Sequence, residues 1–356
     1  MKIIKKERGS VYADKNVWSF FNEQLESFNF SKIFILVDLN TKELCLPYFL
    51  NQIKHTIQIE ILEIPSGEEH KNISSCLTLW EQLSEKRADR KSLLINLGGG
   101  VVTDLGGFIG CTFKRGIEFI NIPTSLLAMV DASIGGKNGL DLGSLKNQIG
   151  VIKNPLFVII DNKFLDTLPE IQFTSGMAEM LKHGLIHSET YLNKIVSFDK
   201  SNKEETSELI WESIKIKNEV VTEDPFETGL RKTLNYGHTL GHAIESYCME
   251  TSKKNALLHG EAVAIGMILE TYISSEILLF PKEKLNFITE KILLKFSKIT
   301  FSKNDIEAII NLLIYDKKNS NGKVLFVLLK NIGHYKADCE VPNELIFNAF
   351  EFYENF

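Results

Sequence analysis

Short apolar runs alternate with amphipathic segments in the first half of the chain. The runs at 32–38, 92–100, 118–123 and 157–161 are rich in Ile, Leu, Val and Phe and have the length of buried strands. Between two of them, residues 72–88 place apolar side chains at helical spacing. Buried strands that alternate with helices are typical of a mostly parallel sheet. The pattern therefore predicts an α/β domain here.

The pattern changes near residue 170. From there to about residue 315, apolar residues recur at helical spacing and strand-like runs are rare. A short strand is predicted near 323–329. We therefore expect an α/β domain over residues 1–168, followed by a mainly α-helical domain over residues 169–356.

Composition and charge narrow the classes of function. The chain has 356 residues, of which 44% are hydrophobic and 24% charged, which is ordinary for a globular protein. A net charge of −6 and the lack of a basic tract argue against nucleic acid as a partner. The sequence shows no transmembrane run and no signal-peptide pattern, so no membrane association is expected. Five scattered cysteines without a CxxC motif are typical of a reducing cytoplasm.

A glycine turn and an acidic strand end could hold a nucleotide. Gly98–Gly100 follow one predicted strand and precede a helix, where backbone N–H groups can approach a phosphate. The spacing does not match GxGxxG, and an ordinary tight turn would use the same residues. Asp38 ends another strand, two residues before Asn40. An acid in this place can hold a ribose hydroxyl, or it can simply cap a turn.

Residues 115–147 combine cations with many glycines. The charged and amide side chains in this stretch are those of Arg115, Asp131, Lys137, Lys146 and Asn147. Several cations with one acid suit an anionic, polyhydroxylated ligand. A solvated surface loop is the alternative interpretation.

Two predicted helices of the second domain carry charged residues in unusual places. Glu179, Lys182 and His183 have i, i+3 and i+4 spacing and share one helix face, either as functional groups or as an ordinary salt-bridged surface. Lys217 falls in the middle of an apolar arc of a helix around 205–222. A lysine there must either meet an anion or extend its ammonium group to solvent.

The segment 231–245 carries the sharpest signal. Arg231, Asn235, His238, His242 and Glu245 follow one another at spacings of 4, 3, 4 and 3, so a continuous helix would place all five on one stripe. The sequence HTLGH is not the HExxH signature. Together with His259 and an upstream glutamate, the histidines predict a His/carboxylate metal site with open positions. Hydrogen-bonded core histidines are the alternative.

Taken together, these motifs resemble the 3-dehydroquinate synthases, a family of sugar phosphate cyclases. The matching segments occur in the family's order and span most of the chain: GEEHKN (67–72), NLGGGVVTDLGGFIG (96–110), residues 114–139, GMAEMLKHGLI (176–186), residues 229–245, HGEAVAIGM (259–267) and DKKN (316–319). The resemblance implies an N-terminal Rossmann-like NAD-binding domain followed by a helical domain that binds metal and substrate.

The resemblance also implies where the cofactors bind. The NAD contacts are expected at Asp38, Asn40, Glu68, Lys71, Gly99, Gly100, Val101, Asp104, Thr124, Ser125, Lys146, Phe164, Leu165, Asp166 and Thr167. The metal, Zn²⁺ or Co²⁺, is expected on Glu179, His238 and His259.

Substrate contacts follow from the same resemblance. The phosphate, carboxylate and hydroxyl groups of the substrate are expected to meet Arg115, Asp131, Lys137, Asn147, Lys182, Lys217, Arg231, Asn235, His238, His242, His259 and either Lys317 or Lys318. His242 and Glu227 are expected to move protons, and Lys182, Lys137 and Asn147 complete the implied catalytic set.

The implied reaction converts 3-deoxy-D-arabino-heptulosonate 7-phosphate to 3-dehydroquinate and phosphate. NAD oxidises a ring hydroxyl, phosphate is eliminated, the ketone is reduced again, and an intramolecular aldol step closes the ring. The resemblance places this lyase in the shikimate pathway of aromatic amino acid biosynthesis, as a cytoplasmic homodimer. A sister sugar phosphate cyclase, a metal-dependent polyol dehydrogenase and a non-catalytic binding protein on the same fold are the competing interpretations.

Overall fold

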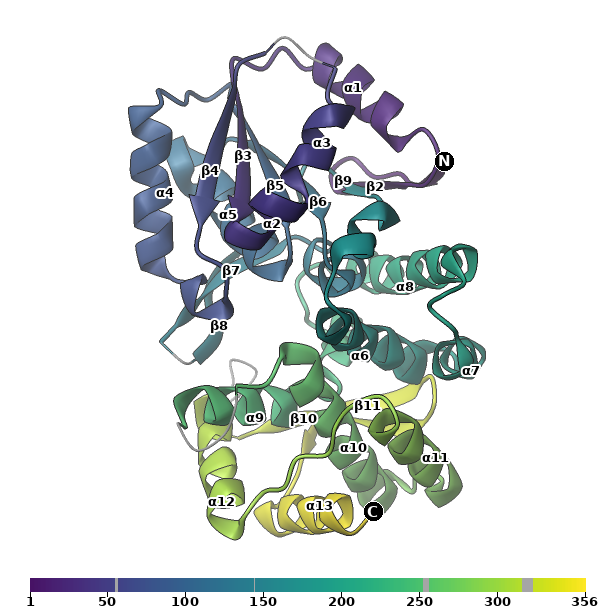
Figure 1. The fold of residues 1–356 in the computed structure, drawn as a ribbon. Coiled ribbons are helices and arrows are strands. Elements are labelled where there is room, and N and C mark those ends of the chain that lie inside the picture. Colours follow the sequence, from purple (N-terminus) through teal and green to yellow (C-terminus); the bar gives the residue numbers. More distant parts are fainter. Residues whose placement is uncertain (55–56, 144, 252–255, 316–322) are drawn as a thin grey trace. The chain divides into compact units, whose positions relative to one another are not determined.

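The computed structural model describes residues 1–54, 57–143, 145–251, 256–315 and 323–356. The chain divides into two units, Met1–Phe173 and Thr174–Phe356 (Figure 1). The sequence pattern placed a domain boundary after residue 168, and the roles assigned to the two domains stay predictions. Among the described residues, no helix has the length and apolar character needed to cross a membrane. All five cysteines are free thiols.

A seven-stranded sheet forms the centre of the first unit. Its order is β1-β2-β9-β6-β5-β3-β4, with β1 and β2 antiparallel and the other neighbours parallel. The strands are β1 (Lys2–Ile4), β2 (Ser10–Ala13), β3 (Ile33–Asp38), β4 (Ile59–Ile64), β5 (Leu93–Gly98), β6 (Glu118–Pro123) and β9 (Phe157–Ile160). The four predicted strands are confirmed as β3, β5, β6 and β9. Edge strand β4 was missed because it interleaves glutamates with its apolar residues.

Helices cover both faces of this sheet (Figure 1). They are α1 (Val17–Ser27), α2 (Leu39–Leu44), α3 (Leu46–Gln52), α4 (Ile73–Glu85) and α5 (Gly100–Thr112). Phe34, Leu36 and Leu94 of the sheet are buried in one core with residues of α4 and α5. On the other face, the rings of Phe21 in α1 and Phe49 in α3 lie 5.8 Å apart. The helix predicted over 72–88 is confirmed as α4.

A separate hairpin follows the sheet strand β6. Its strands, β7 (Lys137–Leu142) and β8 (Leu145–Ile152), pair antiparallel, with Gly139 opposite Gly150. A Cβ atom on Gly139 would lie 2.7 Å from the backbone oxygen of Ile149, so the pairing needs glycine here. The solvated-loop interpretation of residues 115–147 is therefore wrong, because this stretch contains β6, β7 and the start of β8.

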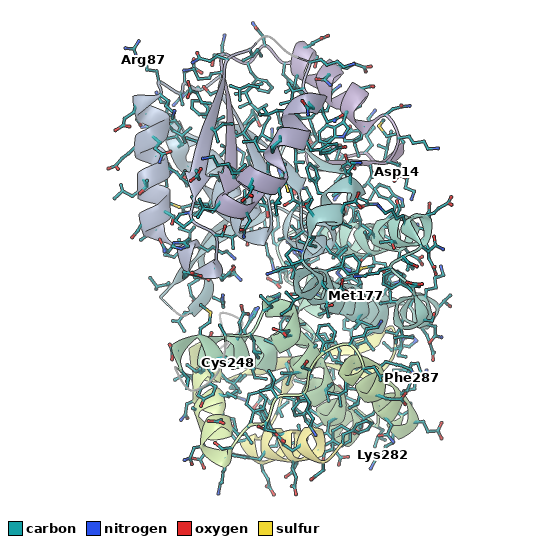
Figure 2. The ribbon with its side chains drawn as sticks, in the orientation of Figure 1. Asp14, Arg87, Met177, Cys248, Lys282 and Phe287 are labelled. Atoms are coloured by element: carbon teal, nitrogen blue, oxygen red, sulfur yellow. The ribbon has the colours of Figure 1, made fainter. Side chains whose placement is uncertain are left out.

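The second unit is mainly helical. Its helices are α6 (Glu170–His187), which begins just before it, α7 (Glu189–Ser197), α8 (Lys203–Glu223), α9 (His238–Glu250), α10 (His259–Leu278), α11 (Lys282–Leu293), α12 (Lys303–Leu312) and α13 (Asn343–Asn355). The predicted strand near 323–329 is confirmed as β10 (Leu325–Asn331), which pairs with β11 (His334–Glu340). Helix α10 contacts α9, α11, α13 and β10 and is buried on nearly all sides. Figure 2 shows the side chains, including buried Cys248 of α9 and solvent-exposed Lys282 of α11.

The continuous helix expected over 231–245 is wrong. Residues Leu230–Asn235 form a short 3-10 helix, and α9 begins only at His238. Between them Gly237 adopts φ 77° and ψ −10°, and a Cβ atom there would lie 2.5 Å from Met267 Cγ. The break results from this left-handed glycine packed against α10. Arg231 and Asn235 consequently do not share a helical stripe with the histidines.

Candidate active site

Three strands of the first unit end at the same edge of the sheet. The chain continues from β3 to β4 on one side and from β5 to β6 on the other, so its path diverges between β3 and β5. Such a divergence opens a crevice at the carboxyl ends of the strands, where α/β folds bind ligands. Asp38, Gly99 and Thr124 lie at the ends of β3, β5 and β6.

The glycine turn after β5 leaves the start of α5 without a side-chain cap. Gly99 is the N-cap residue, Gly100 is the first helical residue, and half-buried Val101 follows. A Cβ atom on Gly98 would lie 2.6 Å from the Val102 side chain, so this turn is tight. Both sequence interpretations fit: the turn is structural, and its backbone N–H groups suit a phosphate. The phosphate contact stays a prediction.

Asp38 has a structural partner. Its Oδ1 accepts a hydrogen bond from the backbone N–H of Thr41 at 2.8 Å, and Thr41 Oγ1 accepts one from the backbone N–H of Asp38 at 3.0 Å. These bonds cap α2, as the turn-residue interpretation expected. Exposed Asn40 donates its backbone N–H to Ser66 Oγ at 3.2 Å. The ribose contact proposed for Asp38 and Asn40 stays a prediction.

Thr124 and Thr167 share a partner, although 43 positions separate them in the sequence. Burial raises the pKa of the Cys45 thiol to about 11, while hydrogen bonds with both threonines act in the opposite direction. Phe164 is buried in the short 3-10 helix Asn162–Thr167, in which Asp166 is exposed. Of the other predicted contacts in this region, Leu165 and Ser125 are half-buried.

Lys71 is the centre of a charged cluster in the first unit. Its Nζ lies 2.8 Å from Asp104 Oδ2 and 3.6 Å from Glu68 Oε1, and it donates to Asn147 Oδ1 at 2.7 Å. Burial alone would lower the pKa of Lys71, but the charges of Asp104, Glu68 and Asp141 raise it. The structure thus brings together three of the predicted cofactor residues with one predicted catalytic residue.

Asp141 organises the hairpin side of this cluster. Its Oδ1 accepts the backbone N–H of Asn147 at 2.7 Å, and its Oδ2 lies 3.4 Å from Lys146 Nζ. Asn147 adopts φ 52°, a left-handed conformation that this bond supports. Lys146 Nζ also lies 3.1 Å from Glu68 Oε1. Sequence reasoning missed Asp141, and only its position four residues after Lys137 could have pointed to it.

The remaining predicted substrate residues of the first unit lie on different elements. Arg115 is exposed, with φ 69°, in the turn before β6. Asp131 is half-buried in the short helical segment Ala128–Ala132. Lys137 is half-buried at the start of β7. Their contacts with substrate stay predictions.

Imidazole and carboxylate groups converge in the second unit. Glu179 on α6 is fully buried, and its Oε1 lies 3.3 Å from His238 Nε2 and 3.6 Å from His259 Nε2. Ligand atoms of His238, His242 and His259 lie within 4.8 Å of one another. The predicted grouping of these four residues is therefore what the structure contains, on α6, α9 and the first turn of α10.

The far nitrogens of two histidines are held in place. His238 Nδ1 lies 3.1 Å from the backbone oxygen of Tyr236, and His259 Nδ1 lies 3.1 Å from Glu245 Oε2. Both rings thereby present Nε2 to the same carboxylate oxygen of Glu179. Outer partners of this kind orient the histidine ligands of metal sites. The sequence identified Glu245 on the polar stripe but not this role.

The same contacts set the protonation of the cluster. Burial lowers the pKa of His238 to about 4, and the nearby charge of Lys182 acts in the same direction. Burial also acts to lower the pKa of His259, but Glu245 and Glu179 raise that pKa to about 10. Burial would raise the pKa of Glu179, but Lys182 and His238 hold it well below its usual value.

Buried cations accompany the cluster. Lys182 is 1% exposed and forms an ion pair with Glu179 one turn earlier on α6. The shared helix face is confirmed, and the surface salt-bridge interpretation is wrong because both groups are buried. His183 Nδ1 lies 2.7 Å from Ser213 Oγ of α8. Lys217, one turn further along α8, is 6% exposed, which favours an anionic partner over an ammonium group extended to solvent.

A short loop carries Glu227 and leads into Arg231. Buried Asp224 accepts hydrogen bonds from the backbone N–H groups of Thr228, Gly229 and Arg231, at 3.0, 2.7 and 3.0 Å. Burial acts to raise the pKa of Asp224, yet these backbone bonds hold it at about 2. Sequence reasoning missed Asp224; the turn sequence EDPFETG was its one signal.

Two predicted site residues meet at the end of this loop. Asn235 Nδ2 donates to Glu227 Oε1 at 2.7 Å, and Arg231 Nη1 donates to the backbone oxygen of Pro225 at 2.7 Å. Arg231 is 2% exposed, so its guanidinium is held inside the unit. Lys317 and Lys318 lie outside the described residues.

Comparisons with known proteins show the family of this chain. Residues 61–175 match the family described as 3-dehydroquinate synthase N-terminal, and residues 176–319 match 3-dehydroquinate synthase C-terminal. A 3-dehydroquinate synthase of Parabacteroides distasonis is 42% identical over 341 residues, which cover 95% of this chain and 96% of that protein. One of Campylobacter jejuni subsp. doylei is 38% identical over 343 residues, 94% and 96% of the two chains.

Solved structures have the same fold. A 2-deoxy-scyllo-inosose synthase complexed with carbaglucose-6-phosphate, NAD⁺ and Co²⁺ has a TM-score of 0.81 at 25% identity and covers 96% of each chain. A 2-epi-5-epi-valiolone synthase from Streptomyces hygroscopicus, with NAD⁺ and Zn²⁺ bound, has a TM-score of 0.82 at 19% identity, over 100% and 99%. The expected fold, a Rossmann-like domain followed by a helical domain, is confirmed. From these matches over nearly its whole length, we conclude that the chain belongs to the 3-dehydroquinate synthase family.

Proposed function

We propose that this chain is a 3-dehydroquinate synthase, a phosphate-eliminating lyase of the shikimate pathway. Its substrate is 3-deoxy-D-arabino-heptulosonate 7-phosphate, and its products are 3-dehydroquinate and inorganic phosphate. The observation that carries the proposal is the buried donor set of Glu179, His238 and His259, in a chain 42% identical to a protein of that name over 95% of its length.

The donor set fits a divalent metal. One carboxylate oxygen and two imidazole nitrogens converge, and the far nitrogen of each ring already has a partner. Zinc and cobalt both accept this combination of ligands and leave a position open. We assign Glu179, His238 and His259 as the ligands, with zinc as the first choice of metal. We assign His242 to proton transfer and not to the ligand set, as the family resemblance implies.

NAD fits the first unit. The carboxyl ends of β3 and β5, the turn at Gly99–Gly100 and the Lys71 cluster all belong to this unit, and strand ends and helix starts of this kind suit a dinucleotide. When bound, NAD supplies a reversible hydride acceptor, and the metal supplies a Lewis acid for the oxygen of the alcohol being oxidised. Because the hydride is returned in each turnover, NAD acts in catalytic amount.

Side chains of the second unit handle the anionic groups of the substrate. Lys182 and Arg231 are cations held almost fully inside the protein, where a charge interacts more strongly than in water. They bind phosphate or carboxylate oxygens and neutralise the charge that develops as phosphate leaves. Asn235 adds an amide whose position is fixed by Glu227.

His242 and Glu227 move protons. The His242 ring lies with its centre 5.1 Å from that of His238 and 5.7 Å from that of His259, next to the donor set. An imidazole there takes the proton of the hydroxyl that is oxidised and returns one on reduction.

The substrate contacts that we assign to the first unit are Arg115, Asp131, Lys137 and Asn147. We also expect a cytoplasmic homodimer.

An assay with catalytic NAD tests the proposal. Zinc-loaded protein is mixed with 3-deoxy-D-arabino-heptulosonate 7-phosphate, and phosphate release and product identity are followed together. Equal amounts of phosphate and 3-dehydroquinate, with no net NADH, are expected. Net NADH on simple polyols without phosphate release would indicate a dehydrogenase. Turnover of another sugar phosphate to a different carbocycle would indicate a sister cyclase.

A further inference from the structure

A buried glutamate of α10 contacts the start of the metal-binding helix. Glu270 is 0% exposed. Its Oε2 accepts the backbone N–H of Gly237 at 2.7 Å, and its Oε1 accepts the backbone N–H of Leu240 at 3.2 Å. Gly237 is the N-cap residue of α9, and His238, the first residue of that helix, lies between the two donors.

Helix α9 needs such an acceptor from elsewhere in the fold. The first N–H groups of an α-helix have no partner within the helix, and a side chain at the N-cap position usually accepts from one of them. Gly237 has no side chain, and the close approach of Met267 excludes one. Glu270 therefore replaces the missing cap, and its negative charge is favourable at a helix N-terminus.

The next residue of α10, Thr271, contacts Tyr236, which directly precedes Gly237. The hydroxyl groups of Thr271 and Tyr236 are hydrogen-bonded, and both residues are fully buried. Thr271 Oγ1 also bonds to the backbone oxygen of Met267. Tyr236 in turn supplies the backbone oxygen that lies 3.1 Å from His238 Nδ1. Two adjacent side chains of α10 thus contact residues that flank the proposed metal ligand: Glu270 accepts backbone N–H groups on both sides of it, and Thr271 bonds to the hydroxyl of Tyr236.

We propose that Glu270 is a positioning residue for the metal site: it fixes the first turn of α9 so that His238 Nε2 faces Glu179, with Thr271 as its support. The proposal rests on the metal site of the proposed function. It assigns Glu270 no contact with substrate, cofactor or metal. In sequence, Glu270 is an isolated acid in the apolar stretch MILETYI, and nothing there connects it with the histidines.

Metal binding by the full-length chain tests this proposal without reference to activity. We would measure Zn²⁺ affinity by competition with a chelator, and record the visible absorption of the Co²⁺-loaded protein, which reports ligand geometry. For Glu270→Gln, which keeps the shape but replaces one acceptor by a donor, we expect about 10- to 100-fold weaker Zn²⁺ binding, the range for outer partners of metal ligands. We also expect an altered Co²⁺ spectrum.

Two further variants keep the test decisive. Thr271→Val removes one of the partners of the Tyr236 hydroxyl while keeping the side-chain shape, and we expect a smaller effect in the same direction as for Glu270→Gln. It replaces Glu270→Gln as the test if that variant does not fold. Ser274→Ala is the matched control. Ser274 lies on the same helix, and its Oγ donates to the backbone oxygen of Glu270 and accepts the backbone N–H of Leu329 in β10. Its loss therefore disturbs the contact between α10 and β10 without removing a bond to α9.

The outcomes separate the two claims. A lower melting temperature for Glu270→Gln with wild-type Zn²⁺ affinity and an unchanged Co²⁺ spectrum would overturn the positioning role. The same loss of affinity in Ser274→Ala would also overturn it, because general destabilisation would then explain both. A wild-type chain that binds neither metal would contradict the metal site itself, and with it this inference.

Discussion

The two units differ in the kind of polar side chains that they cluster. In the first unit, Lys71 and Lys146 contact Asp104, Glu68 and Asp141, so charges of opposite sign meet within the chain. In the second unit Glu179 also pairs with Lys182, but there the possible metal-ligand atoms of three histidines lie within 4.8 Å of one another. The first arrangement is close to complete in the chain alone, whereas the second concentrates groups that donate electron pairs to a cation.

This difference separates a preformed binding surface from a centre that its ligand completes. Opposite charges in contact stabilise one another and hold a hairpin and a loop in position before any ligand arrives. Converging imidazoles gain their full stabilisation only when a cation lies among them. Removal of metal should therefore weaken the second unit and leave the first unchanged. The predictions that follow test this contrast, from the largest expected effect to the smallest.

Replacing each of the two α9 histidines in turn should separate metal binding from catalysis. We expect His238→Ala to lose metal and activity together, because one of three ligands is gone. We expect His242→Ala to keep its metal, while kcat falls about 10²- to 10⁴-fold, the usual contribution of a proton-transfer group. Metal content per chain and steady-state kinetics measure the two effects.

The control for both variants is His187→Ala, which changes a half-exposed histidine near Glu219 at the end of α6. It should keep both metal and turnover. Loss of metal from His242→Ala would mean that His242 is a ligand, and stoichiometric metal in His238→Ala would remove His238 from the ligand set.

In the first unit, Lys71→Met should weaken NAD binding. The substitution leaves Asp104 without its closest cation and removes the bond to Asn147. Loss of a hydrogen bond to a charged group corresponds to about a 10- to 100-fold weaker Kd. Quenching of the protein's tryptophan fluorescence during titration with NAD measures it. Lys86→Met removes a more exposed ion pair with Glu60 and is the matched control. Equal NAD affinity in both variants would restrict Lys71 to a structural role.

Lys217→Ala should raise KM for the sugar phosphate about tenfold, the effect of losing roughly 1.4 kcal/mol of binding. Lys217 is 6% exposed on α8, and contact with an anionic group of the substrate is the role that the proposed function gives it. Lys215→Ala, which changes an exposed lysine two positions earlier, should leave KM unchanged. A wild-type KM for Lys217→Ala would support the purely structural interpretation of this lysine.

Zinc binding should release about one proton at pH 8. His259 has its pKa raised to about 10 in the metal-free chain, so it is charged at that pH and must become neutral to bind metal. His238, with a pKa of about 4, and the ionised Glu179 contribute none. Calorimetry in buffers of different ionisation enthalpy counts the protons. This proton release should disappear as the pH rises through 10. Release of almost no protons at pH 8 would contradict the charged state of His259.

The sequence predicted most of the fold, and the reasons for its failures are physical. Continuous apolar runs identified β3, β5, β6 and β9, but β4 escaped because Glu60 and Glu63 interrupt its apolar side chains. The apparent helix over 231–245 broke at Gly237. Side-chain spacing cannot reveal a left-handed glycine whose conformation depends on contact with Met267, 30 residues later.

The candidate site, like the fold, could be predicted from the sequence only in part. Residue type and spacing identified Glu179, His238, His242 and His259, because metal ligands need specific side-chain chemistry. The groups that hold these ligands in position were missed or given no role, because any buried acid or backbone carbonyl can act as such a hydrogen-bond partner. Glu270 and Asp224 act on backbone N–H groups, so their function depends on tertiary contacts that no motif encodes.

The most direct test of the account is a crystal structure of the zinc-loaded chain with anomalous diffraction measured at the zinc edge. We predict one strong anomalous peak in the second unit, within bonding distance of Glu179, His238 and His259, with the His242 nitrogens outside that distance. A peak bound by the three histidines without Glu179, or no peak in this cluster, would contradict the account.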